Sequence, residues 1–191
     1  ALSKIKSTSL ETDATNLVLL SSQTASNDAS ITFDSSLITD TYDVYQFIVR
    51  EMKPVTDSTS LFARVSVSGS FITSTNYAFA SHESNEASSS NVVNSRHDNA
   101  SSKFKLTGLS GVQGNADLEK TQGEITFFNS DNALKVIQTH FTYFYTDGRM
   151  VIANSSQCLD NNRTNRVDGF QFFQNSGNIS SGIFTLYGVK T

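Results

Sequence analysis

The chain has 191 residues, of which 37% are hydrophobic and 17% are charged, and its net charge is -4. This length predicts one sizeable domain, or a domain with an arm, and the net negative charge with no run of Lys and Arg disfavours nucleic-acid binding. Ser, Thr and Asn make up roughly a third of the residues and helix formers are sparse, which favours strands and hydrogen-bonding loops.

Cellular context is indicated by the first residues and by the cysteine count. The start at Ala1 predicts removal of the initiator Met, with no secretory leader and no apolar run long enough to cross a membrane. Cys158 is the single cysteine, so an intramolecular disulfide is excluded, and its predicted role is a small buried residue rather than a nucleophile.

Residues 1–36 are expected to form an extended N-terminal arm, because their apolar residues are scattered among Ser, Thr and Asn. Such a segment cannot bury its apolar side chains against itself, so it should lie on another surface. The alternative is a first strand preceded by a flexible leader. Under the arm hypothesis the attachment contacts are Leu2, Ile5, Leu10, Leu17 and Val18.

Strand patterns begin near residue 37, and residues 37–191 are predicted to form the folded domain. Residues 42–52 have apolar side chains at both parities and should form a central strand. Residues 61–67 alternate, which predicts a strand with one face toward water. Further strands are expected over 77–81, 103–109, 123–129, 133–145, 150–154, 167–174 and 182–190.

About nine or ten short strands with turn residues between them predict an all-β protein, an antiparallel β-sandwich of jelly-roll type. The last two strands, within residues 169–190, are expected to pair as a closing hairpin across Asn175, Ser176, Gly177 and Asn178.

Residues 82–102 are rich in Ser and Asn without apolar periodicity, so a protruding loop is expected. His82 and His97 lie in it beside acidic residues, but their spacing matches no metal-ligand pattern, and a solvated loop is the favoured interpretation. A carbohydrate-binding role would use Arg96, His97, Asp98 and Asn99 of this loop.

An aromatic strand face is predicted by Phe141, Tyr143 and Tyr145, which share one parity. The favoured interpretation is a sandwich core, and the alternatives are a subunit interface or a sugar-stacking platform. In the carbohydrate-binding hypothesis, an exposed Tyr143 or Tyr145 would complete the site formed by the loop.

Catalytic motifs are absent from the sequence: it has no nucleophile elbow, P-loop or dinucleotide-binding fingerprint. His140 falls within a predicted strand and is expected to be hydrogen-bonded or to face solvent rather than to act as a base. No enzyme activity, cofactor or metal is therefore predicted.

Several segments resemble β-rich appendage proteins of tailed bacteriophages. They are the Tyr-Asp-Val-Tyr-Gln-Phe run from Tyr42, the following Pro-Val-Thr-Asp break and Gly-containing strand, and the Ser-Gly-Asn-Ile-Ser-Ser-Gly-Ile-Phe-Thr-Leu-Tyr-Gly ending at Gly188. The first ten residues also resemble the attachment segments of such proteins. The similarity covers about 150 residues, from Phe33 to Thr191.

The resemblance implies a homotrimeric virion protein, made in the bacterial cytoplasm, that contacts other virion proteins such as tail, portal or capsid. A short tail fibre, tail-tip knob or capsid decoration is expected, because the chain lacks the long shaft of a complete fibre. The competing hypothesis is a host-receptor module that binds a surface glycan.

Overall fold

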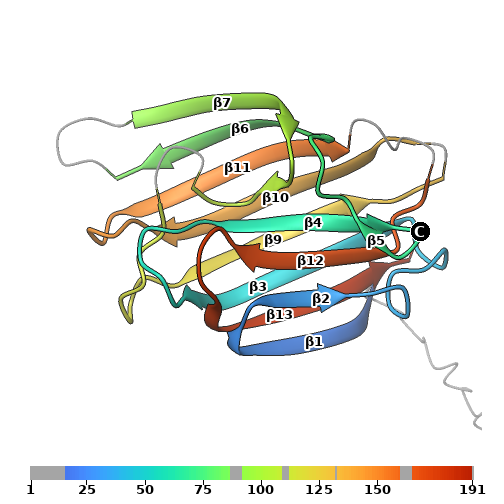
Figure 1. The fold of residues 1–191 in the computed structure, drawn as a ribbon, viewed down its shortest axis with the longest axis horizontal. Helices are drawn as coiled ribbons and strands as arrows, with labels where there is room; N and C mark the ends of the chain where they lie inside the picture. Colours follow the sequence, from blue (N-terminus) through green and yellow to red (C-terminus); the bar gives the residue numbers. More distant parts are fainter. Residues whose placement is uncertain (1–15, 87–91, 109–111, 132, 160–164, 191) are drawn as a thin grey trace, which may run out of the picture.

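The computed structural model describes residues 16–86, 92–108, 112–131, 133–159 and 165–190, and all strand pairs within them are antiparallel. The protein is an all-β sandwich of two sheets, as predicted (Figure 1). The finer prediction, jelly-roll connectivity, stays a prediction.

The large sheet has eight strands in the order β1-β13-β3-β9-β10-β11-β6-β7. Its strands alternate between one buried and one less buried face, as Val44–Pro54 and Lys135–Phe144 illustrate. The strands, in chain order, are β1 (Leu17–Asp28), β3 (Val44–Pro54), β6 (Tyr77–Asn85), β7 (Val92–Ser101), β9 (Thr121–Phe128), β10 (Lys135–Phe144), β11 (Met150–Leu159) and β13 (Ile179–Val189).

The small sheet follows the order β2-β12-β4-β5, and β8 pairs with β4. Its strands are β2 (Ser30–Phe33), β4 (Leu61–Val67), β5 (Ser70–Phe71), β8 (Phe104–Lys105) and β12 (Gly169–Gln174). It lies over the β9, β3 and β13 part of the large sheet (Figure 1). The large sheet is therefore wider than its partner and extends past it at the β7 edge.

Aromatic side chains fill the space between the sheets. The ring of Phe170 in β12 lies 4.4 Å from that of Phe47 in β3 and 5.8 Å from that of Phe127 in β9, measured between centroids. Tyr77 and Phe104 extend this core beneath β6, with centroids 4.7 Å apart. Buried aromatic pairs in offset and edge-to-face contact add to the burial of their large apolar surfaces, so this core holds the two layers together.

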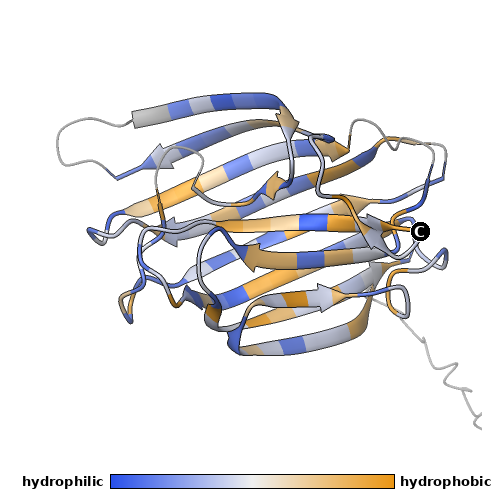
Figure 2. Ribbon diagram, viewed as in Figure 1, coloured by the Kyte–Doolittle hydropathy of each residue, from blue (hydrophilic) through white to orange (hydrophobic). Residues whose placement is uncertain are grey.

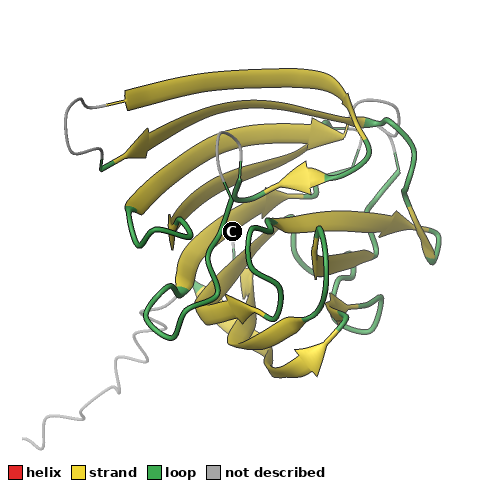
Figure 3. Cartoon of the chain, turned by 60° about the vertical axis from the view of Figure 1, so that its left-hand side comes forward, coloured by secondary structure: helices red, strands yellow, loops and turns green. Residues whose placement is uncertain are grey.

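Among the described residues, 106–108 and 112–119 cover the part of the large sheet that lies beyond the small sheet, where no strand covers it. Gln113 forms isolated bridges to Thr59 and Tyr145, which hold this segment beneath the sheet. Tyr143, Tyr145, Val151 and Ala153 are buried there as a second cluster. Figure 3 shows the long curved strands of the large sheet and the loops on its inner side.

Three expectations from the sequence need correction, and the first concerns the arm. Residues 17–33 form β1 and β2, which pair with β13 and β12. This segment therefore belongs to both sheets, and the predicted boundary at residue 36 is wrong for it. Neighbouring strands that are distant in the sequence bury Ala25, Ile31 and Phe33 of this segment, whereas Leu17 and Leu19 are exposed. Residues 1–15 lie outside the described residues.

The closing hairpin is also wrong, although both of its strands exist. β12 lies in the small sheet and β13 in the large sheet, so they do not pair with each other. The intervening turn is held instead by the segment after β3: the Asn175 N–H donates to the Ser60 carbonyl, and the Ser176 N–H donates to Thr59 Oγ1. Gly177 has φ +70°, which favours glycine at this turn.

The loop expected over residues 82–102 is largely a β-hairpin formed by β6 and β7. β7 is mostly hydrophilic (Figure 2), so its composition does not indicate a strand. Its backbone hydrogen bonds to β6 specify the strand, and its position at a sheet edge allows polar side chains on both faces. The edge position explains why this strand lacks the apolar periodicity by which a strand is predicted from sequence.

Candidate functional site on the outer face of the large sheet

Residues paired across neighbouring strands form rows on the outer face of the large sheet, because opposite residues point to the same side. One row is apolar and crosses seven strands. We call it the apolar row, and its members from β1 to β6 are Leu17, Val189, Val44, Phe128, Val136, Cys158 and Ala78. Leu17 is 38% exposed, and the neighbouring Leu19 is 60% exposed. The outer face thus presents a continuous apolar strip at one end of its strands.

A second row on the same face is polar. We call it the polar row, and its members from β9 to β7 are Glu124, His140, Asn154, His82 and Ser95. His140 Nδ1 lies 2.6 Å from Asn154 Oδ1, and the Ser95 hydroxyl lies 3.0 Å from His82 Nδ1. His140 is exposed and hydrogen-bonded, as predicted. The row offers hydrogen-bonding groups from five adjacent strands to solvent.

Three hollows formed by described residues lie on this outer face. The largest, of about 620 Å³, has a floor of small side chains that includes Ala78, Ala80 and Cys158, with Leu134 and His97 also lining it. The sheet is hollow here because these small side chains leave space that larger ones would occupy.

The second hollow, of about 290 Å³, is lined by His82 and Asn154 of the polar row. It shares Ala80 and Ser156 with the largest hollow, so the two are continuous across β6 and β11. We call these two hollows, together with a third that lies along the polar row and shares no lining residue with them, the outer groove.

The third hollow, of about 280 Å³, combines opposite charges with neutral polar groups. Arg50 and Glu124 line it together with His140 and Thr142. Glu124 accepts a long hydrogen bond, 3.4 Å, from Gln46 Nε2. Within the described residues, no hydrogen bond or ion pair of the Arg50 side chain is found, so its guanidinium is open to a ligand.

The predicted carbohydrate residues of β7 are divided by the structure. His97, Asp98 and Asn99 line the largest hollow, whereas Arg96 lines none of the hollows described above. Asp98 also forms an ion pair of 3.8 Å with Lys105. Three of the four residues therefore lie at the outer groove, on a strand instead of a loop.

The predicted contribution of an exposed tyrosine is wrong. Tyr143 and Tyr145 are buried on the inner face, which confirms the core interpretation of this aromatic strand face. The Tyr143 hydroxyl donates to Glu83 Oε1 at 2.6 Å and accepts from the Gly108 N–H. Burial, followed by the charge of Glu83, raises the pKa of Tyr143 far above its usual range. Neither tyrosine can contact a ligand in the outer groove.

The predicted attachment residues fall in two groups. Leu17 and Val18 lie in β1, where Leu17 begins the apolar row. Leu2, Ile5 and Leu10 lie outside the described residues, so their attachment role stays a prediction.

Arg50, Glu124 and Asn154 were missed by sequence reasoning. Strand parity could have placed each on the face opposite the buried residues of its own strand. It could not show that they share one surface, because that depends on the pairing of distant strands.

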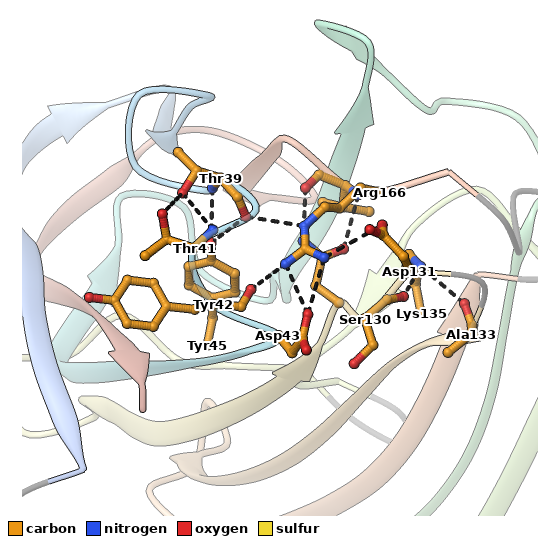
Figure 4. Close-up of polar contacts among 12 residues, drawn as sticks. Thr39, Thr41, Tyr42, Asp43, Tyr45, Ser130, Asp131, Ala133, Lys135 and Arg166 are labelled. Atoms are coloured by element: carbon orange, nitrogen blue, oxygen red, sulfur yellow. Dashed lines mark hydrogen bonds and ion pairs between the residues drawn. The ribbon is translucent and has the colours of Figure 1, made fainter. Parts of the chain in front are cut away.

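Another polar cluster, around Arg166, fastens the loop before β3 to the segment before β12 (Figure 4). Arg166 donates from Nη2 to the Tyr42 carbonyl at 2.5 Å, from Nε to the Thr39 carbonyl at 3.2 Å and from Nη1 to Asp43 Oδ1 at 3.1 Å. The nearby Lys135 ammonium donates to the carbonyls of Ser130 and Ala133. These cations are engaged by the protein itself, so the cluster has a structural role.

Replacing Arg166 with Ala should lower the free energy of unfolding by about 1–3 kcal/mol, because carbonyl acceptors lose their donors. Urea denaturation measures the change. Arg149→Ala is the control: its 2.7 Å pair with Asp147 is solvent-exposed and should contribute about 0–1 kcal/mol. Equal losses in both variants would contradict the structural role of Arg166.

Comparison of the chain with protein-family models, curated proteins and solved structures found no match. In the part of the chain that the structure describes, no group of His, Cys, Asp and Glu is arranged to hold a metal ion. Over those same residues, no helix has the length and apolar character needed to cross a membrane. The outer face of the large sheet is therefore the candidate site on geometric grounds alone.

Proposed function

We propose that this protein is a non-enzymatic structural component of a tailed-bacteriophage virion, a β-sandwich attached to a tail or capsid partner. The phage-like motif from Ser176 to Gly188 supports this proposal, because it forms the turn after β12 and nearly all of β13. β13 pairs with both β1 and β3 in the large sheet. This part of the resemblance therefore lies within the large sheet, one strand from its β1 edge.

The observation that carries the proposal is the β1 end of the apolar row. Leu17, Val189, Val44 and Phe128 lie side by side there, with Leu19 next to them, and the strip continues to the free edge of β1. Exposed apolar strips of this kind typically mark an interface. We propose a second copy of the chain as its occupant, within a homotrimer in which neighbours also cover the edge strand.

Replacing Leu17 and Leu19 together with Lys should convert the trimer to monomer, because two exposed apolar contacts are exchanged for charges. Each buried Leu contributes about 1.5–3 kcal/mol, and about 1.4 kcal/mol corresponds to tenfold in affinity. Light scattering measures the mass. The control is Ser22→Lys with Thr24→Lys, on the polar part of the same strand, which should remain trimeric.

The same variants test the virion role when they are introduced into a phage that encodes the chain. Mass spectrometry of purified particles should detect the parent protein and the control variant, and should find the Leu17→Lys, Leu19→Lys variant depleted. A monomeric parent protein, or particles without the protein, would contradict the proposal.

Host-glycan recognition is a second candidate function. The outer groove favours it, because its two largest hollows lie over β10, β11 and β6, away from β1, and stay open when the β1 end is covered. This role is compatible with a place on the outside of a particle.

A further inference from the structure

The outer groove contains two chemically different surfaces on one face of the large sheet. Its apolar end, over β6 and β11, has a floor of Ala78, Ala80 and Cys158. Its polar end runs along the polar row to Arg50 and Glu124. A ligand that fits both ends must carry a small apolar group beside several hydroxyl groups.

The polar end matches the needs of sugar hydroxyls, each of which donates one hydrogen bond and accepts others. The Glu124 carboxylate is an acceptor, Arg50 supplies donors without an acceptor, and His140, whose Nδ1 donates to Asn154 Oδ1, presents Nε2. Because Nδ1 of His140 is engaged with Asn154, its Nε2 is left for a ligand. Neutral hydroxyls can use this mixture of donors and acceptors. The opposite charges of Arg50 and Glu124 balance each other, so the site does not require a charged ligand.

The apolar end matches a methyl group with a polar neighbour. The small floor residues leave room beneath a ligand, and Ser156 and His97 line the same hollow. An acetamido substituent has this combination, because its methyl needs an apolar surface while its N–H and carbonyl need hydrogen-bonding partners. A plain hydroxyl at the same position would leave the apolar floor in contact with water.

We propose that the outer groove binds an oligosaccharide containing N-acetylated sugars, with an acetamido group over Ala80 and hydroxyl groups along the polar row. This proposal deepens the glycan-recognition candidate by naming its ligand class and its residues. Asn154 lies between the two ends and contacts His140, so we assign it a role in positioning the imidazole as well as in binding.

Isothermal titration of the full chain with tri-N-acetylchitotriose and with cellotriose tests the proposal, because these trisaccharides differ only in having an acetamido group or a hydroxyl at each sugar's second carbon. Tri-N-acetylchitotriose should bind, and cellotriose should bind at least about tenfold more weakly. Ala80→Phe should abolish binding by filling the hollow, and Asn154→Ala should weaken it at least about tenfold. Thr24→Phe, also an exposed outer-face position, should bind as the parent protein does.

Absence of binding by tri-N-acetylchitotriose would overturn the proposal, as would equal affinity for cellotriose or unchanged affinity in Ala80→Phe. Circular dichroism and light scattering of each variant confirm that its fold and mass match those of the parent protein. These outcomes are separate from the virion proposal: particle incorporation depends on Leu17 and Leu19, whereas glycan affinity depends on Ala80 and Asn154.

Discussion

Replacing Phe170 with Ala should lower the free energy of unfolding by about 3–5 kcal/mol, a large part of the stability of a domain this size. Phe170 is fully buried, and its ring contacts aromatic rings on both sheets. The centroid distances are 4.4 Å to Phe47, 5.1 Å to Phe172 and 5.8 Å to Phe127. Truncation leaves a cavity between two layers whose paired strands limit collapse, so most of the lost contact is not recovered.

Phe173→Ala is the matched control for this prediction, because it removes the same ring from the same strand on the opposite face. Phe173 is only partly buried, with Phe62 6.0 Å away and the Arg64 guanidinium 5.0 Å from its centroid. Its loss should cost about 1–2 kcal/mol, since a site that is partly open to solvent leaves no enclosed cavity. Guanidinium denaturation distinguishes the two variants, and similar losses would show that the centre of the core lies elsewhere.

Alkaline pH should destabilise the protein through Tyr77, whose pKa is raised to about 12 by burial. Its folded-state pKa lies above the unfolded value of about 10, so the folded state holds the proton more tightly. The stabilising contribution is full below about pH 10 and is lost as pH rises to about 12. Two pKa units correspond to about 3 kcal/mol. Burial also raises the pKa of Tyr45, which acts in the same direction.

Tyr77→Phe checks the assignment, because it removes the titrating group and keeps the ring. The hydroxyl donates to the Ile72 carbonyl at 2.9 Å and accepts from the Val65 N–H at 3.2 Å. The variant should be less stable by about 1–3 kcal/mol at neutral pH. Its unfolding free energy should fall less steeply between about pH 10 and 12. A slope identical to that of the parent protein would exclude Tyr77 as a source of the alkaline transition.

Local patterns in the sequence predict most strands, because their alternation reflects burial on one face. Residues 61–67 illustrate this: their alternation predicts a strand, and they form β4. The central strand predicted over residues 42–52, from apolar side chains at both parities, corresponds to β3, which pairs with β13 and β9. The aromatic face with Tyr143 was likewise identified as core. Where composition masked the alternation, as in β7, the prediction failed, because an edge strand is stabilised by backbone pairing without an apolar face.

The sequence by itself determined the all-β class, the positions of most strands and, where the alternation is clear, the side of a strand that is buried, since these follow from the period of the side chains. Only the tertiary structure decided which strands pair: it separated β12 from β13 and placed Glu124, His140 and Asn154 in one row. Strand pairing between distant segments depends on packing of the whole core, and a slip of one residue would turn these side chains inward. The outer groove therefore depends on the pairing register of the strands, which the sequence alone does not reveal.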